Sequence, residues 1–187
     1  MDADVGDGDT GSGVSRACKE ILLNLRCLDF SFNLKSCAVA LGEIIANSFG
    51  GTSGPLYGSF LSNASLVLKN SGNTIQDFAA AFEKGVQGVQ ALGKCNVGDR
   101  TMYDVLVPVS KLLQQLTLHN NLTSSEISQQ VVDEARKAAD YTMNLRATKG
   151  RTRYLGGKEI GKKDPGCELV FEWIHLLNER LRKDAKL

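Results

Sequence analysis

The chain has 187 residues, enough for one well-buried domain and short for two, so we expect residues 1–187 to form a single domain. A formal net charge of +1 and an aromatic content of 6 % indicate neither nucleic acid nor a membrane surface as a partner. The five cysteines form no C-x-x-C pair, which indicates neither a zinc site nor a disulfide framework and favours a reducing cytoplasm.

The segment from Met1 to Gly13 contains four carboxylates and four glycines, with hydroxyls at Thr10 and Ser12. From Val14 onward the pattern is helical, so an acidic, glycine-rich loop leads into a helix N-terminus. Backbone N–H groups at a helix start bind anions, and clustered Asp carboxylates bind a hard divalent cation. The loop is therefore a candidate site for a nucleotide with Mg²⁺. A solvated turn is the alternative, and it is the commoner explanation for an isolated run of this kind.

The spacing of apolar residues predicts amphipathic helices along the whole chain, and no alternating strand of useful length is present. We expect helices at about 13–25 and 34–48, a third from an N-cap at Ser53 and a fourth that ends near 92–93. A fifth begins near 101, a sixth runs from the capping box at 123–126 to about 147, and the last begins at 164–165. The predicted fold is all-α, an antiparallel up-and-down bundle of about seven helices joined by short loops.

Four turns are rich in glycine and polar residues: 2–13, 50–58, 93–100 and 150–166. They precede the first, third, fifth and seventh predicted helices. In an up-and-down bundle, connections that are two helices apart emerge at the same end. We therefore expect the four turns to share one face and to build one composite site.

These turns, in this order, resemble the nucleotide-binding (L-type) domain of the dihydroxyacetone kinases. The matching segments are DADVGDGDTG at 2–11, GGTSGPLYG at 50–58, GDRTM at 98–102 and GRTRYLG at 150–156, followed by DPG at 164–166. Each segment is weak alone, but four in sequence across essentially the whole chain are specific. The resemblance implies an antiparallel barrel of eight amphipathic helices with the nucleotide in its mouth.

The resemblance also assigns roles to individual residues. It implies that Asp2, Asp7 and Asp9 bind two Mg²⁺ ions against the nucleotide phosphates, and that Asp4 is not a ligand. The residues implied to contact ATP or ADP are Thr10, Gly11, Ser12, Gly13, Thr52 and Ser53 at the phosphates, Gly93 and Met102 at the adenine, and Arg151, Asp164, Pro165 and Gly166 in the segment that closes over the nucleotide. No residue is a convincing general base, so we assign no catalytic residue.

Without the resemblance, some of these residues have ordinary explanations. Met102 lies on an apolar helical face, where a core position is the default. Asp99 and Arg100 would form a loop ion pair of little energetic value. The basic loop around Arg151 and Arg153 would be a solvated surface.

The sequence departs from the family pattern in three places. Only Met1 precedes the aspartate loop, where the family has a helix, so we expect the first of the family's eight helices to be missing here. Thr152 and Arg153 follow Arg151, where the family usually has small residues, so we expect the loop to close differently. The family's substrate-binding domain, with its ketone-binding histidine, has no counterpart in these 187 residues.

The resemblance implies transfer of the γ-phosphate of ATP to dihydroxyacetone, glyceraldehyde or a related short sugar held by a separate substrate-binding domain or subunit. Catalysis in this half would be electrostatic and positional. Two alternatives stay open: an ADP-binding subunit that a phosphotransferase system recharges, and a non-catalytic nucleotide or metal sensor. Thr10 favours the ATP-dependent form, because the phosphotransferase type commonly has His after its last metal aspartate. The family is also compatible with FAD-cyclising activity and with a homodimer of the full-length protein.

Overall fold

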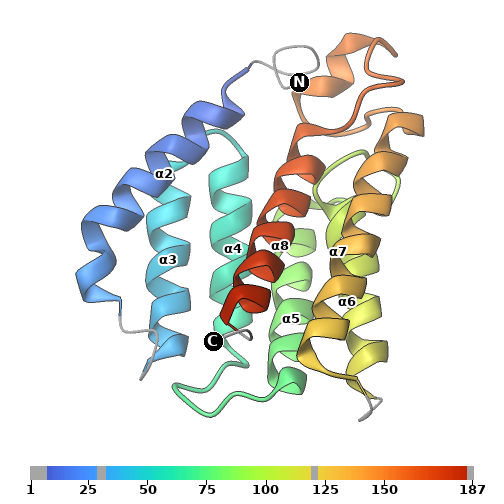
Figure 1. Ribbon diagram of the computed structural model, residues 1–187. Helices are drawn as coiled ribbons and strands as arrows, with labels where there is room; N and C mark the ends of the chain where they lie inside the picture. The colour runs from blue at the N-terminus through green and yellow to red at the C-terminus, as the bar shows by residue number, and fades with distance from the viewer. Residues whose placement is uncertain (1–7, 29–32, 119–121, 185–187) are drawn as a thin grey trace. The chain divides into compact units, whose positions relative to one another are not determined.

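The computed structural model describes residues 8–28, 33–118 and 122–184. Every regular element in these ranges is helical, which confirms the all-α class. The seven α-helices of these ranges are α2 (Thr10–Asn24), α3 (Leu34–Ser48), α4 (Ser53–Ser65), α5 (Ile75–Gly93), α6 (Tyr103–Thr117), α7 (Ser124–Tyr141) and α8 (Pro165–Asp184) (Figure 1). Short 3₁₀ helices are η1 (Leu25–Cys27), η2 (Thr142–Asn144) and η3 (Arg151–Leu155).

The helices belong to two compact units, which we call the α2–α5 unit and the α6–α8 unit; the boundary falls between Cys95 and Asn96. In the α2–α5 unit each helix packs on the next one in sequence (Figure 1). In the α6–α8 unit α7 packs on α6 and α8, and α8 also contacts α6. Consecutive helices are therefore spatial neighbours within each unit, as an up-and-down chain path requires. A single domain over residues 1–187 stays a prediction.

Small residues allow α3 and α4 to approach closely. A Cβ atom at Gly58 would lie 2.7 Å from the Cβ of Ala46 and 2.8 Å from the carbonyl oxygen of Gly42. The centre of this unit is a cluster of small and aliphatic side chains, Ala38, Ala64, Leu68 and Ala81. The close backbone contact between α3 and α4 therefore depends on the missing side chain at position 58.

Replacing Gly58 by Ala should lower the free energy of unfolding by about 1–3 kcal/mol, because the new methyl group overlaps backbone atoms that cannot rotate away. Urea unfolding measures the change. Gly11→Ala is the matched control, since Gly11 is also helical and a Cβ atom there meets nothing within 4 Å. Equal stability of the two variants would contradict the close α3–α4 contact.

In the α6–α8 unit the core lies along the facing sides of the three helices. Its fully buried members are Val105, Val109, Ala135, Ala139 and Cys167. The start of α7 has the predicted capping box: the Thr123 hydroxyl accepts the backbone N–H of Glu126, whose carboxylate accepts the N–H of Thr123. The sequence signal for this helix start is confirmed.

A second capping box opens α5, where Asp77 accepts the backbone N–H of Thr74 and lies 2.8 Å from the Lys69 ammonium. The hydrogen bond from Lys69 and those from Thr74 lower the pKa of Asp77 from its ordinary 3.8 to about 2. Because the folded-state pKa is depressed, the stabilisation by ionised Asp77 is fully present above the ordinary pKa and is lost as the pH falls towards 2.

We therefore expect wild type and Asp77→Asn to differ in unfolding free energy by a constant amount above about pH 5, and this difference to shrink between about pH 4 and pH 2. Urea unfolding of both proteins at a series of pH values measures it. A difference that is the same at pH 2 and pH 7 would contradict the assigned role of the carboxylate.

Two helix boundaries and one capping residue differ from the sequence prediction. Helix α2 begins at Thr10 rather than near residue 13, although Gly11 and Gly13 lie in its first turn. Helix α5 ends at Gly93 as predicted, but the left-handed residue at its end is Lys94 (φ 47°) rather than the glycine. Helix α7 ends at Tyr141 rather than near residue 147. Tertiary packing explains the first case, as the contact of Gly13 with Phe49 shows below.

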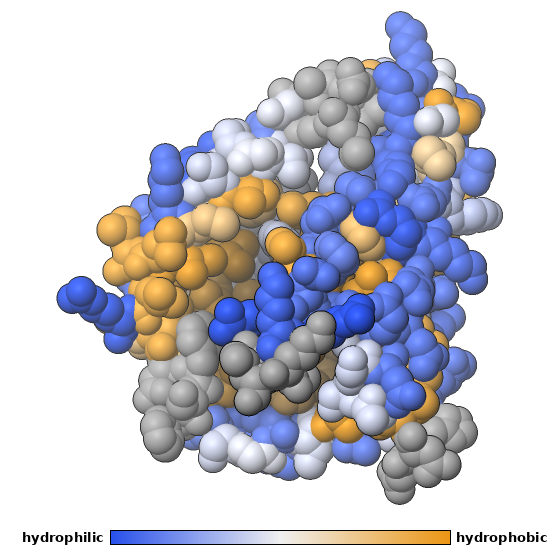
Figure 2. Space-filling view, in the orientation of Figure 1, coloured by the Kyte–Doolittle hydropathy of each residue, from blue (hydrophilic) through white to orange (hydrophobic). Residues whose placement is uncertain are grey.

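Helix α2 carries exposed leucines at positions 22 and 23, and exposed Leu25 follows in η1. Figure 2 shows apolar side chains gathered over this helix and its neighbour α3. The buried residues of α2 are Gly13 and Ala17. Its apolar side is thus only partly covered. Among the described helices, none combines the length and the apolar character that crossing a bilayer requires.

Candidate functional site

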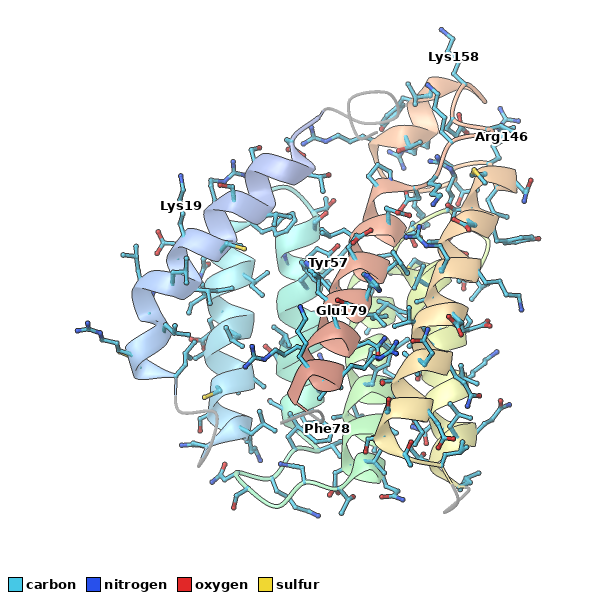
Figure 3. The ribbon with its side chains drawn as sticks, in the orientation of Figure 1. Lys19, Tyr57, Phe78, Arg146, Lys158 and Glu179 are labelled. Atoms are coloured by element: carbon cyan, nitrogen blue, oxygen red, sulfur yellow. The ribbon has the colours of Figure 1, made fainter. Side chains whose placement is uncertain are left out.

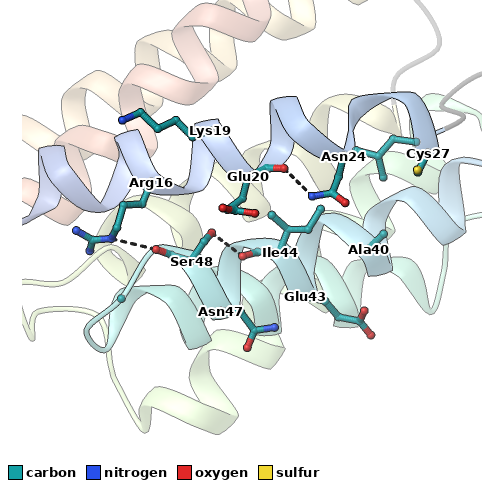
Figure 4. Close-up of a pocket in the computed structure, with 12 residues that line it drawn as sticks. Arg16, Lys19, Glu20, Asn24, Cys27, Ala40, Glu43, Ile44, Asn47 and Ser48 are labelled. Carbon is teal, nitrogen blue, oxygen red and sulfur yellow. Dashed lines mark hydrogen bonds between the residues drawn. The ribbon is translucent and has the colours of Figure 1, made fainter.

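The start of α2 is held against the end of α3. A Cβ atom at Gly13 would lie 2.8 Å from the carbonyl oxygen of Phe49, so only glycine permits this approach. Arg16 donates from Nε to the Ser48 carbonyl (3.2 Å, Figure 4) and from Nη2 to the Phe49 carbonyl (2.7 Å). These contacts fix the first turn of α2, with its outward N–H groups, beside the α3–α4 turn.

The α3–α4 turn brings the second predicted phosphate segment to the same place. Gly50 and Gly51 have positive φ angles of 87° and 59°, which favour glycine. Thr52 is exposed at the start of α4, and Ser53 is half-buried in its first turn. Because Phe49 contacts Gly13, the segments at 10–13 and 52–53 lie at the same end of the α2–α5 unit.

Gly93, assigned to the adenine pocket, lies at that end as well. A Cβ atom at Gly93 would be 3.1 Å from a methyl carbon of Leu56, in the second turn of α4. Tyr57, labelled in Figure 3, packs its ring 5.3 Å from the ring of Phe49. Three predicted segments of one unit therefore meet where α2 and α4 begin and α5 ends.

The metal ligands are the part of the site that the structure describes least. Asp2 and Asp7 lie outside the described residues, whereas Asp9 is exposed directly before α2. Within the described ranges, no group of three or more Asp, Glu, His or Cys side chains is arranged to hold a metal ion. These ranges contain one of the three predicted ligands, so the aspartate triad stays a prediction.

In the α6–α8 unit, Met102 and the Asp164–Gly166 segment come together. A Cβ atom at Gly166 would lie 3.7 Å from the Cβ of Met102, and the Cys167 thiol donates to the Thr101 carbonyl at 2.8 Å. Met102 is buried. The starts of α6 and α8 are thus adjacent in space, although Tyr103 and Pro165, the first residues of the two helices, are 62 positions apart in the sequence.

Asp164 is buried and caps α8: its Oδ2 accepts the backbone N–H of Cys167 at 2.9 Å, and its own N–H donates to the Thr142 hydroxyl. Burial raises the pKa of Asp164, against the opposing effect of the Cys167 N–H and of Arg100. Its carboxylate is thus engaged within the protein. Contact of Asp164, Pro165 or Gly166 with a nucleotide stays a prediction.

The loop ion pair between Asp99 and Arg100, the alternative explanation of these residues, is not formed, because the two side chains have different partners. Asp99 accepts the N–H of Asn96 at 2.8 Å and the hydroxyl of Thr148, two bonds that lower its pKa despite desolvation. The side chain of Arg100 lies near the start of α8 instead, with its Nη1 atom 3.9 Å from an oxygen of the Asp164 carboxylate. Both side chains thereby connect the start of α6 to the long loop before α8.

Two organising residues were missed in the sequence. Buried Asp104 accepts the N–H groups of Gly98 and Thr101, and the T-x-x-D pattern from Thr101 to Asp104 is a signal that could have found it. Glu159 is buried inside a basic loop. Its pKa is lowered by backbone N–H donors, first its own and then those of Ala147 and Gly157, and no sequence pattern marks it.

Arg151 begins η3 and is exposed, after Gly150 with a φ of 66°. The next basic residue, Arg153, stacks its guanidinium 4.7 Å from the Tyr154 ring centre. The exposed position is compatible with an arginine that reaches a bound phosphate.

A surface groove of about 860 Å³ lies between α2 and α3 (Figure 4). Its lining mixes charges of both signs: Arg16, Lys19 and Glu20 come from α2, and Glu43 comes from α3. None of the described residues assigned to the nucleotide is among its lining residues. The groove nevertheless adjoins the candidate site, because Arg16, Ser48 and Gly50, which hold the start of α2 and the α3–α4 turn, also line it.

Known proteins match this arrangement over nearly the whole chain. The DAK2 domain model matches residues 4–179. The chain is 33 % identical over 181 residues to the ADP-binding subunit DhaL of the PEP-dependent dihydroxyacetone kinase of Escherichia coli K12, which covers 95 % of this chain and 84 % of that subunit. It is 32 % identical over 185 residues to the triokinase/FMN cyclase of Rattus norvegicus, of which it spans 32 %.

Two crystal structures of the dihydroxyacetone kinase of C. freundii have the same fold. The native form matches with a TM-score of 0.72 at 29 % identity, over 96 % of this chain and 30 % of that one. The form in complex with AMP-PNP and Mg²⁺ matches with a TM-score of 0.71. The chain thus spans about a third of the kinase chains it resembles and most of the separate DhaL subunits. With the DAK2 match covering 4–179, this chain belongs to the DAK2 domain family.

Proposed function

We propose that the chain is the nucleotide-binding part of a dihydroxyacetone kinase, which binds ATP or ADP with Mg²⁺ and delivers the γ-phosphate to a short-chain ketose or aldose. The observation that carries this proposal is the meeting of predicted phosphate segments at the start of α2, where Gly13 packs on Phe49. Helix starts that are beside glycine-rich turns are natural phosphate sites. Two comparisons support the proposal: a relative is named as an ADP-binding subunit, and a structural neighbour is in complex with AMP-PNP and Mg²⁺.

The residues present suit a magnesium-bound nucleotide chemically. Carboxylates such as Asp2, Asp7 and Asp9 are the ligands that Mg²⁺ prefers, and three of them provide for two ions. When bound, Mg²⁺ neutralises the charge of the phosphates during transfer. The backbone N–H groups of 10–13 would donate to phosphate oxygens, and Thr52 and Ser53 would add hydroxyl donors.

The other residues would orient the nucleotide. Met102 would pack on the adenine ring, since its thioether adapts to a flat apolar surface. Arg151 would fork onto a phosphate oxygen pair and so exclude water from the transferred group. No side chain here is assigned to deprotonate the acceptor, so the acceptor hydroxyl of dihydroxyacetone or glyceraldehyde is held by a substrate-binding domain or subunit. The cysteine usage supports a cytoplasmic location.

The test combines this chain with the substrate-binding subunit of a DhaL-containing relative, dihydroxyacetone, ATP and Mg²⁺. We expect dihydroxyacetone phosphate to form in the complete mixture. No dihydroxyacetone phosphate should form when either of the two proteins is left out. The chain alone should bind Mg·ATP in a calorimeter. Binding without any sugar phosphate in the complete mixture would favour a nucleotide sensor instead.

A second candidate is an ADP-binding subunit that a phosphotransferase system recharges, which the names of several similar relatives favour. Thr10 after Asp9 favours direct use of ATP. The two differ in nucleotide exchange. ATP-dependent transfer predicts that ADP leaves during dialysis, whereas ADP that stays bound, with phosphate supplied from phosphoenolpyruvate, would establish the second candidate.

A further inference from the structure

The loop between η2 and α8 is closed by a buried carboxylate. Glu159 is 1 % exposed, and its two oxygens accept the backbone N–H groups of Ala147 (3.1 Å) and Gly157 (2.9 Å). These bonds draw the two ends of the segment 147–157 to one point. Arg151 and η3 lie within the ring that results. An anionic acceptor makes these hydrogen bonds stronger than neutral ones.

The outer side of the same loop is held by a buried arginine. Arg100 is 1 % exposed, and its Nη2 donates to the carbonyl groups of Lys162 (2.9 Å) and Glu159 (3.4 Å). Its backbone is left-handed (φ 60°), which is unfavourable for a side chain of this size. Nε and Nη1 are buried without a hydrogen-bond partner. A backbone conformation of this kind persists only where the surrounding contacts hold it in place.

Both contacts connect the loop to the candidate site. Arg100 is two residues before Met102, and its guanidinium faces the Asp164 cap of α8. Beyond these anchor points the loop extends past the ends of α7 and α8 (Figure 1), and Lys158 points away from the helices (Figure 3). The exposed tip carries Arg151, while its base is buried.

We infer that Glu159 and Arg100 are positioning residues: together they form a clasp, the Glu159–Arg100 clasp, that holds the loop carrying Arg151 in one conformation before a nucleotide phosphate binds to it. The inference rests on the proposed function, since it assigns Arg151 to a phosphate. Glu159 itself touches no nucleotide. Its effect is to fix the loop before binding, so that less ordering is needed when the nucleotide binds.

The first test is Glu159→Gln, which places an amide NH₂ against one of the two N–H donors and so breaks one bond of the clasp. In the absence of nucleotide we expect trypsin to cleave after Arg151, Arg153 and Lys158 about tenfold faster than in wild type, because the loop opens more often. Glu179→Gln, the same change on the exposed face of α8, is the control and should be cleaved like wild type.

The second readout separates positioning from folding. Mg·ADP should protect the wild-type loop from trypsin, and protection should be lost in Glu159→Gln at matched occupancy of the nucleotide. In the complete kinase mixture, the KM for ATP should rise about tenfold while helicity is retained. If Glu159→Gln had the same cleavage rate, the same protection by Mg·ADP and the same KM for ATP as wild type, the inference would be overturned.

If Glu159→Gln does not fold, a second pair of variants at Arg100 tests the same inference. Arg100→Lys keeps a donor for the Lys162 carbonyl and should stay close to wild type, whereas Arg100→Met should reproduce the opened loop. Equal trypsin sensitivity of these two variants would also overturn the inference. If wild type binds no Mg·nucleotide, the proposed function fails, but the cleavage rates without nucleotide still decide whether the clasp exists.

Discussion

Replacing Asp9 by Asn should weaken the binding of Mg·ATP by at least about tenfold, because the neutral amide removes a charged ligand from the metal. Asp9 is exposed directly before α2 and its side chain makes no capping bond to the helix, so the helix does not depend on it. Isothermal titration calorimetry with Mg·ATP measures the affinity. Circular dichroism should show unchanged helicity.

The aspartate loop provides a matched control for this substitution. Asp7→Asn should have the same effect as Asp9→Asn, whereas Asp4→Asn, the same chemical change in the same loop, should leave the affinity unchanged. Binding of ATP without Mg²⁺ should be similar in all of these proteins. Three variants with equal losses would indicate a general effect of charge rather than specific metal ligands.

Replacing Asp104 by Ala should lower the free energy of unfolding by about 2–4 kcal/mol, because the backbone N–H groups of Gly98 and Thr101 lose their acceptor in a largely buried place. The loss also releases the turn that places Met102, so Mg·ATP should bind more weakly. Chemical unfolding and calorimetry measure the two effects.

The control is Asp133→Ala on the exposed side of α7, where the carboxylate accepts only a side-chain amide of Gln129. A surface change of this kind should alter stability by about 0.5 kcal/mol or less. If Asp104→Ala were as stable as Asp133→Ala, the buried carboxylate would not organise the start of α6.

The helices could be predicted because their signals are local. The capping box at Thr123 and the Asp164–Pro165 helix start lie where the sequence indicates them, and α3 has its expected limits. The boundaries that differ depend on distant contacts. Helix α2 begins at Thr10 because Gly13 packs on the carbonyl group of Phe49, which is 36 positions further along the chain. Such contacts have no local signature.

The candidate site shows the same division. The glycine-rich segments are visible in the sequence, and the structure brings 10–13, 52–53 and 93 together in one unit and Met102 with Gly166 in the other. The supporting residues were not visible. Glu159 accepts backbone N–H groups, which no side-chain pattern reveals, and Arg100 binds carbonyl groups that are about 60 residues away along the chain.

The most direct test is a crystal structure of this chain with Mg²⁺ and a non-hydrolysable ATP analogue. We predict Mg²⁺ at about 2.0–2.1 Å from carboxylate oxygens of Asp2, Asp7 and Asp9, with phosphate oxygens on the backbone N–H groups of residues 10–13. Aspartate carboxylates directed away from one another, or a nucleotide bound elsewhere, such as in the groove between α2 and α3, would contradict it.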